Sequence, residues 1–207
     1  MEGWRIGHSM GGAPGVEIQP GLLERHRRPA AVLCYEAFRS KFEPILGPPE
    51  HGVAILERDL ELALVIAASA GDRLVGLAGL ECAGRYFFNP RWSTFAREFG
   101  WLRGLLRCVV FLPFARHRGE GDVTVGALAV DASMRGQGVG TRLMEAVFDG
   151  AREREFRSVS LEVVDTNPGA RRLYERLGFA AIRTRRCPYV CRRLGFSAVT
   201  MMVREIA

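Results

Sequence analysis

A run of closely spaced glycines between residues 130 and 141 is the part of this sequence best suited to chemistry. It reads Val-Asp-Ala-Ser-Met-Arg-Gly-Gln-Gly-Val-Gly-Thr and stands between an apolar segment and an amphipathic one. Glycine adopts positive φ readily and lets the backbone approach a ligand closely. The helix expected next would offer unpaired N–H groups and the positive end of its dipole. The run therefore predicts an anion site suited to a pyrophosphate, and an enzyme that uses a phosphorylated cofactor.

Two common phosphate-binding motifs do not fit this run. A dinucleotide fingerprint needs Gly-x-Gly-x-x-Gly, but Gly140 comes one residue too early and Thr141 takes the expected place. A Walker A loop needs a lysine followed by serine or threonine, and the one lysine of the chain, Lys41, is far from the run. The kind of phosphate site therefore depends on the residues that follow.

A second stretch, between residues 161 and 179, supplies that context. It reads Leu-Glu-Val-Val-Asp-Thr-Asn-Pro-Gly-Ala and, after two arginines, Leu-Tyr-Glu-Arg-Leu-Gly-Phe. With Arg135, Gly138 and Gly140, which match an Arg/Gln-x-x-Gly-x-Gly/Ala pattern, it resembles the coenzyme A-binding part of the GNAT acyltransferases. The resemblance is close over residues 122–182 and holds only in outline before them.

The resemblance implies a fold, a co-substrate and a reaction. The GNAT fold is an α/β architecture of mixed α+β character, with a central, mostly antiparallel mixed sheet flanked by helices; here a helical insertion would precede the fourth strand. The reaction would pass an acetyl group from acetyl-CoA to a primary amine, on a small molecule or peptide, by direct attack in a ternary complex. No metal is implied. In the family the pantetheine pairs with the exposed edge of the strand before the loop, and loop amides hold the pyrophosphate. The implied cofactor contacts are Leu128, Ala129, Val130, Arg135, Gly136, Gln137, Gly138, Val139, Gly140, Thr141 and Asn167.

The resemblance also implies catalytic roles. Tyr174 matches the family's usual general acid, and a phenol with a pKa near 10 could share its proton with a thiolate. Glu162 takes the position of the base in the ribosomal-protein alanine acetyltransferases, and Glu81, at the end of an expected strand, is the other candidate. A chain of water molecules is a third route. A packing role for Tyr174 and a solvated strand position for either glutamate are the structural alternatives.

Two other functions fit the same residues. The donor could be a longer acyl-CoA, or the domain could bind coenzyme A without turnover and act as a regulatory or interaction module. The sequence does not identify the acceptor amine, because fold does not fix function.

The elements that must position these residues follow from hydrophobic periodicity. The predicted helices cover residues 30–42, 53–60, 139–156 and 167–178, and the predicted strands cover residues 16–19, 62–68, 74–82, 122–130, 158–164, 179–184 and 196–204. Within an insertion over residues 84–121, apolar side chains recur at steps of three and four, at Trp92, Phe95, Phe99, Leu102 and Leu105. This spacing predicts one helical face in a core or dimer contact; a substrate wall and a membrane-surface helix are the alternatives.

Composition favours one soluble domain over residues 15–207 after a flexible tail, residues 1–14. The formal charge is +6, but the densest group of arginines, residues 183–193, is broken by apolar residues, so nucleic-acid binding is not expected. Neither a signal peptide nor a spanning segment is evident, so a membrane partner is not expected. The five cysteines lie mostly in apolar runs, and Cys187 and Cys191 lack a second pair for zinc. A cytoplasmic protein without a metal is predicted, and a homodimer stays open.

Overall fold

The computed structural model describes residues 15–111, 122–186 and 195–206, and the predicted fold class is confirmed. The expected tail, residues 1–14, and the cysteines Cys187 and Cys191 lie outside the described residues.

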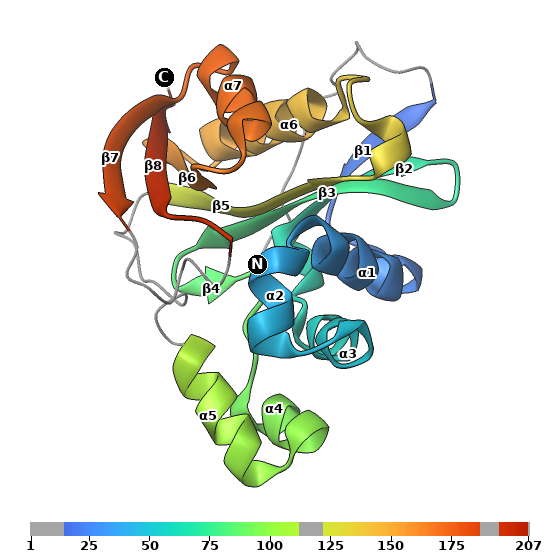
Figure 1. The fold of residues 1–207 in the computed structure, drawn as a ribbon. Helices are drawn as coiled ribbons and strands as arrows, with labels where there is room; N and C mark the ends of the chain where they lie inside the picture. Colours follow the sequence, from blue (N-terminus) through green and yellow to red (C-terminus); the bar gives the residue numbers. More distant parts are fainter. Residues whose placement is uncertain (1–14, 112–121, 187–194, 207) are drawn as a thin grey trace.

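A mixed sheet forms the centre of the molecule (Figure 1). Its strands run in the order β1-β2-β3-β5-β6-β8-β7, with β4 paired to β3. Among the described strands the β5–β6 pair is parallel and the other pairs are antiparallel. The strands are β1 (Val16–Pro20), β2 (Val65–Ala70), β3 (Arg73–Cys82), β4 (Arg85–Tyr86), β5 (Asp122–Val130), β6 (Ser158–Val164), β7 (Ala180–Arg186) and β8 (Ala198–Glu205).

Helices cover both faces of the sheet (Figure 1). On one face lie α6 (Val139–Glu153) and α7 (Pro168–Arg176). On the other lie α1 (Arg27–Ala37), α2 (Arg39–Leu46) and α3 (Pro49–Asp59). The insertion between β3 and β5 holds α4 (Trp92–Phe99) and α5 (Trp101–Phe111), which extend beyond α3, away from the sheet (Figure 1).

Each face of the sheet has its own apolar core. Val123, Val125 and Leu161 pack on the side of α6 and α7, whereas Leu77 and Ala127 pack on the side of α1 to α3. Because side chains alternate along a strand, central strands that are covered on both faces are apolar almost throughout. This explains the long apolar runs in the sequence.

The N-terminal helices differ from the prediction. The helix expected over residues 30–42 is divided at Phe38, whose φ of −118° and ψ of 24° leave the helical region. Gly47, with φ 85°, then ends α2, and Pro49 opens α3. The apolar spacing does not change across Phe38, so periodicity gave no sign of the division. The strand expected from residue 62 starts later, because Leu62–Leu64 form a 3-10 turn.

The stripe predicted from Trp92 to Leu105 is not one helical face. Gly100, with φ 77°, turns the chain between α4 and α5. Phe95 is fully buried, whereas Trp92 and Leu102 are 48% and 63% exposed. The expected continuous core contact is therefore wrong.

Within the described ranges, the structure contains no helix with the length and apolar character needed to cross a membrane.

Candidate active site

The two parallel strands at the centre of the sheet separate half-way along their length. β5 and β6 pair from Asp122 with Ser158 as far as Val125 with Leu161. Beyond that point β6 continues against β8, and β5 continues against β3. The edge of β5 that would face β6 therefore has no strand partner among the described residues over 126–130. The predicted pantetheine contacts Leu128, Ala129 and Val130 lie on this part of β5.

A bulge at Gly126 marks the point of separation. Val125 pairs with Leu80 and Ala127 with Gly79, which leaves Gly126 as an extra residue on β5. A Cβ on Gly126 would come within 2.5 Å of Oε1 of Glu81 and 2.9 Å of the Phe87 ring. A side chain at this position would displace the Glu81 carboxylate, which lies directly against the bulge.

The glycine run forms the predicted turn into α6. Gly136 and Gly138 have φ of 76° and 81°, and Gly138 is the N-cap of the helix. A Cβ on either glycine would meet no protein atom within 4 Å, so the space above the turn is open. Gly140 differs, since its Cβ would make ordinary contacts with Leu173 of α7 at 3.5 Å and with Val130 at 3.8 Å.

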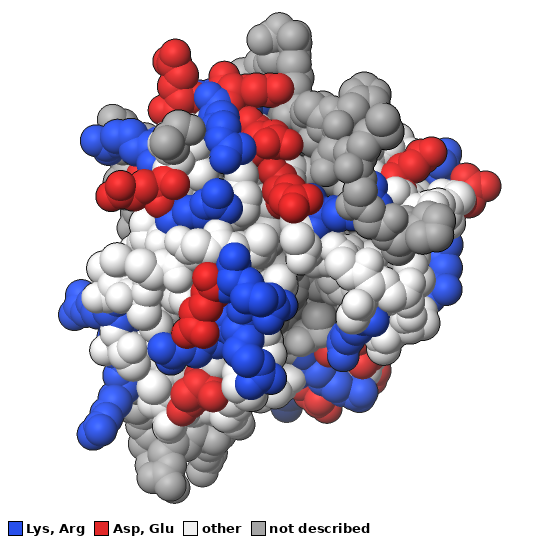
Figure 2. Space-filling view, turned by 90° about the horizontal axis from the view of Figure 1, so that it is seen from above, with Lys and Arg blue, Asp and Glu red and all other residues white. Residues whose placement is uncertain are grey.

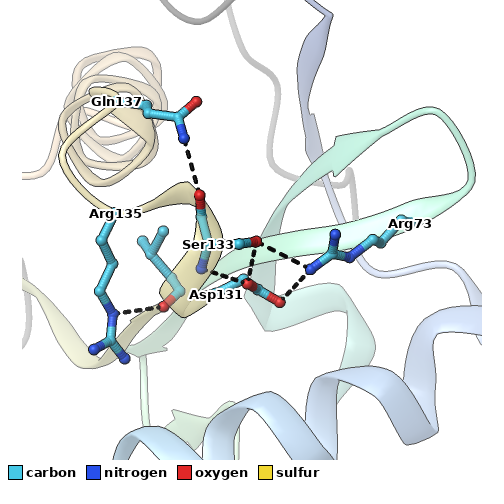
Figure 3. Close-up of polar contacts among 6 residues, drawn as sticks. Arg73, Asp131, Ser133, Arg135 and Gln137 are labelled. Atoms are coloured by element: carbon cyan, nitrogen blue, oxygen red, sulfur yellow. Dashed lines mark hydrogen bonds and ion pairs between the residues drawn. The ribbon is translucent and has the colours of Figure 1, made fainter.

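The other residues of the run are arranged around the turn. Arg135 donates from Nε to the Val130 carbonyl over 3.2 Å, and Gln137 donates from Nε2 to the Ser133 carbonyl over 2.9 Å (Figure 3). Val139 is buried, and Thr141 is half-buried in the first turn of α6. The backbone of this first turn, together with Gly136 and Gly138, borders the open space.

Asp131 and Arg73, which sequence reasoning missed, fix the start of the loop (Figure 3). The Asp131 carboxylate accepts hydrogen bonds from the Ser133 hydroxyl at 2.6 Å and amide at 2.8 Å, and from Arg73 of β3 at 2.7 Å. The two bonds from Ser133 and the one from Arg73 lower the pKa of Asp131 to about 2. The signal was the Asp-x-Ser spacing, which is typical of a turn closed by the aspartate side chain.

Tyr174 lies on α7, which packs against the start of α6. Asn167 caps α7 by accepting from the Ala170 amide over 3.0 Å, and Pro168 follows as its first residue. Tyr174 is 8% exposed and stands edge-on to Phe179, with the ring centroids 5.9 Å apart. Burial raises its pKa to about 12. The phenol therefore stays protonated at neutral pH, and the adjacent Leu173 lies against Gly140.

The two candidate bases lie on the opposite face of the sheet from Tyr174. Leu161 and Val163 belong to the core under α6, so Glu162 between them points to the side of α1 to α3, where it is exposed. By the same alternation Glu81 follows Leu80 and is half-buried, paired with Thr124. The separation of β5 and β6 thus lies between the tyrosine face and the glutamate face.

A buried pair of hydroxyls lies near the end of the segment in which β5 and β6 are paired. Oγ1 of Thr124 lies 2.9 Å from Oγ of Ser160, and both residues are buried. The pair ties β5 to β6 one residue before their hydrogen-bonded register ends at Val125. It sets the inner limit of the opening between the strands.

Charge on the outer face of α6 and α7 is mixed. Seen from that side, arginines gather near the middle of the face, with acidic side chains beside them (Figure 2). No group of three or more His, Cys, Asp or Glu in the described part of the chain is arranged to hold a metal. Cys34 is fully buried, and burial raises its thiol pKa to about 12, so it is a poor nucleophile.

Comparison with known proteins gives one family. Residues 32–179 match the family model described as "Acetyltransferase (GNAT) family". The chain is 36% identical over 81 residues to the Xenopus laevis protein named "Probable N-acetyltransferase camello"; the match covers 38% of this chain and 37% of that protein.

Solved structures are similar over nearly the whole chain. yncA from Salmonella typhimurium, a structure with its cofactor acetyl-CoA, has a TM-score of 0.60 at 14% identity, covering 93% of this chain and 95% of its own. The ribosomal-protein-S18-alanine N-acetyltransferase from Escherichia coli has a TM-score of 0.54 at 20% identity, covering 93% and 94%. At these identities the likeness concerns the fold.

Proposed function

Since the chain belongs to the GNAT family of acetyltransferases, we propose that it transfers an acetyl group from acetyl-CoA to a primary amine by direct attack in a ternary complex. Acetyl-CoA supplies the thioester that is attacked and the thiolate that leaves.

The observation that carries the proposal is the unpaired edge of β5 leading into an open glycine turn. A strand edge without a partner can pair with an extended, amide-containing chain, and residues 128–130 provide it. The turn at Gly136 and Gly138 and the first amides of α6 suit a pyrophosphate, because they combine open space with the positive end of a 15-residue helix. The residues present therefore fit the cofactor.

Arg135 and Asn167 contribute to the same site by fixing the backbone segments that border it. Arg135 is bonded to the Val130 carbonyl, so it fixes the end of the strand edge relative to the turn. Asn167 holds the start of α7, and therefore the position of Tyr174, through its cap. Neither role needs the side chain to contact the cofactor itself.

Proton transfer is assigned to two residues on opposite sides of the strand separation. Tyr174, kept protonated by burial, donates to the leaving thiolate on the side of α7. We assign Glu81 ahead of Glu162 as the group that accepts the proton of the attacking amine, directly or through water. Its carboxylate lies against the bulge at Gly126, where the strands part, whereas Glu162 is exposed.

Residues 15–207 would act as one domain in the cytoplasm, in keeping with free cysteines at Cys34 and Cys82. The acceptor would approach from the side of α1 to α3, where both glutamates lie.

A thiol-release assay with acetyl-CoA across a panel of amines tests the proposal. We expect release of free coenzyme A that depends on the amine, and acetyl-CoA binding by calorimetry without any amine. Binding without release for every amine would identify a coenzyme A-binding module. Faster release from succinyl- or long-chain acyl-CoA would replace the acetyl donor by a longer one.

A further inference from the structure

The α4–α5 hairpin exposes an apolar face that the proposed reaction does not use. On α5, Trp101, Leu102, Leu105 and Leu106 are 69%, 63%, 44% and 67% exposed. Their spacing of i, i+1, i+4 and i+5 places them along one side of the helix. Soluble surfaces carry single exposed apolar residues, but a contiguous group of this kind marks an interaction site.

The exposed side chains of α5 are not needed for the packing of α4 against α5. The two helices meet on their other sides, where a Cβ on Gly104 would come within 2.8 Å of the backbone of Ala96 and Phe95. Phe95 is fully buried and belongs to the core on the side of α1 to α3. The exposed leucines of α5 therefore point away from a contact that is already complete.

The hairpin is fastened to the rest of the fold by partly buried ion pairs and hydrogen bonds. Arg91 donates from its amide and from Nε, each over 3.1 Å, to Asp59, whose side chain is fully buried. Glu98 pairs with Arg58 and, over 3.1 Å, with His51. Arg107 donates to the Ile45 carbonyl over 2.6 Å. The apolar face is thus presented in a fixed orientation.

The hairpin carries more positive than negative charge. Between Arg91 and Arg107 the chain has four arginines and one acidic residue, Glu98. Glu98 is paired with Arg58, and Arg91 is paired with Asp59. Arg103 is exposed and lies next to Leu102 on α5. We propose that this face docks on the surface of a membrane containing anionic phospholipids. Trp101 and the leucines would enter the boundary between headgroups and acyl chains, and Arg103 would contact phosphate.

The length of α5 suits a surface helix and not a spanning one. Its 11 residues extend over roughly 16 Å, about half of the ~30 Å hydrocarbon core. Tryptophan favours the headgroup level, where its ring is buried and its N–H remains hydrated. A second copy of the chain is the competing occupant, but this side of α5 offers far fewer side chains than the roughly 20–30 residues a side of a standard interface.

Docking there would leave the cofactor site accessible. The hairpin lies on the side of α3, whereas α6 and the glycine turn lie across the sheet (Figure 1). Docking through α5 requires neither turnover nor a particular acceptor.

Flotation of the full-length protein with lipid vesicles tests the inference. We expect binding to vesicles of phosphatidylcholine and phosphatidylserine at least about tenfold stronger than to phosphatidylcholine alone, and weaker at high salt. The double variant Leu102→Glu, Leu106→Glu should lower binding more than about tenfold. Ile182→Glu is the matched control, since Ile182 on β7 is 63% exposed, as Leu102 is. Equal binding by the double variant and the control would overturn the proposal.

A fluorescence measurement locates the contact. The chain has three tryptophans, so the variant Trp4→Phe, Trp92→Phe reports on Trp101 alone. We expect its emission to shift to the blue and to be quenched by brominated lipid when anionic vesicles are added. Arg103→Gln should weaken binding about fivefold. Unchanged emission, or a lipid-free dimer that Leu102→Glu separates in sedimentation, would overturn the proposal.

Discussion

Tyr174 combines deep burial with a phenol that has kept its proton. It is 8% exposed, and burial raises its pKa to about 12. If it donates to the leaving thiolate, Tyr174→Phe removes the proton but keeps the ring that packs on Phe179. We expect turnover to fall about a hundredfold, with little change in acetyl-CoA affinity, measured by thiol release and calorimetry.

A second buried tyrosine provides the control for that variant. Tyr35 is fully buried, and its hydroxyl donates to the Gly47 carbonyl over 2.7 Å, away from the glycine turn. Tyr35→Phe should lower the free energy of unfolding by about 1 kcal/mol without changing turnover. Because the pKa of Tyr174 lies near 12, its ionisation should not lower the rate of the native protein at moderately alkaline pH. A turnover unaffected by Tyr174→Phe would refute the acid role.

Glu81 and Glu162 can be separated by the pH dependence of their variants. Glu81→Gln should reduce kcat/KM about a hundredfold at neutral pH, as loss of a general base does at the lower end of its range. The deficit should shrink as pH rises, because more of the amine is already deprotonated in solution. The same series on Glu162→Gln is the comparison, and a larger, pH-dependent loss there would transfer the role to Glu162.

At the scale of elements, the turn into α6 distinguishes two glycines that look alike in the sequence. Gly138 has φ 81° and borders open space, whereas Gly140 lies inside α6 with room for a Cβ. Gly138→Val should abolish acetyl-CoA binding and cost about 1–2 kcal/mol of folding stability. Gly140→Ala should bind normally, since its new methyl group makes ordinary contacts. Calorimetry on both variants checks this, and normal binding by Gly138→Val would contradict the site.

The turn before the glycines depends on the ionised Asp131 carboxylate. Its pKa is held at about 2, below the ordinary 3.8, so its contribution to stability is complete above pH 4 and is lost as pH falls toward 2. Asp131→Asn should therefore flatten this acid limb of the stability curve, as measured by denaturant unfolding at several pH values. It should also weaken acetyl-CoA binding severalfold at neutral pH. An unaltered acid limb would show that Arg73 and Ser133 do not depend on the charge.

How far the sequence predicts each element depends on whether its signals are local. Strand β6 and the start of α7 were predicted correctly, because β-branched alternation and the Asn167–Pro168 cap act within a few residues. The division at Phe38 and the turn at Gly100 were missed, since apolar spacing continues across both. The role of Arg73 could not be predicted, because its partner Asp131 is 58 residues away. The bulge at Gly126 and its contact with Glu81 were not predicted, because both depend on the register between β3 and β5.

At the scale of the whole molecule, the sheet lies between the proposed cofactor side and the proposed acceptor side. One face carries α6, α7 and the open turn, and the other carries α1 to α3 and the two glutamates, so cofactor and acceptor would meet where β5 and β6 part. The α4–α5 hairpin extends beyond this arrangement (Figure 1). Loosening the attachment of the hairpin should therefore leave the cofactor site unchanged.

A substitution at Glu98 can test whether the hairpin opens without disturbing the cofactor site. Its burial would raise the carboxyl pKa, but hydrogen bonds from Arg58 and His51 outweigh burial and lower the pKa below its ordinary value. The attachment is thus complete at neutral pH and weakens as pH falls below the ordinary pKa of a glutamate, about 4.3.

Glu98→Gln should lower the local opening free energy of α4 and α5 by about 1.5–3 kcal/mol at neutral pH. Hydrogen exchange should show faster exchange there, unchanged protection in α6, and unchanged acetyl-CoA affinity. Equal loss of protection in α6 would mean that hairpin and cofactor site unfold as one unit.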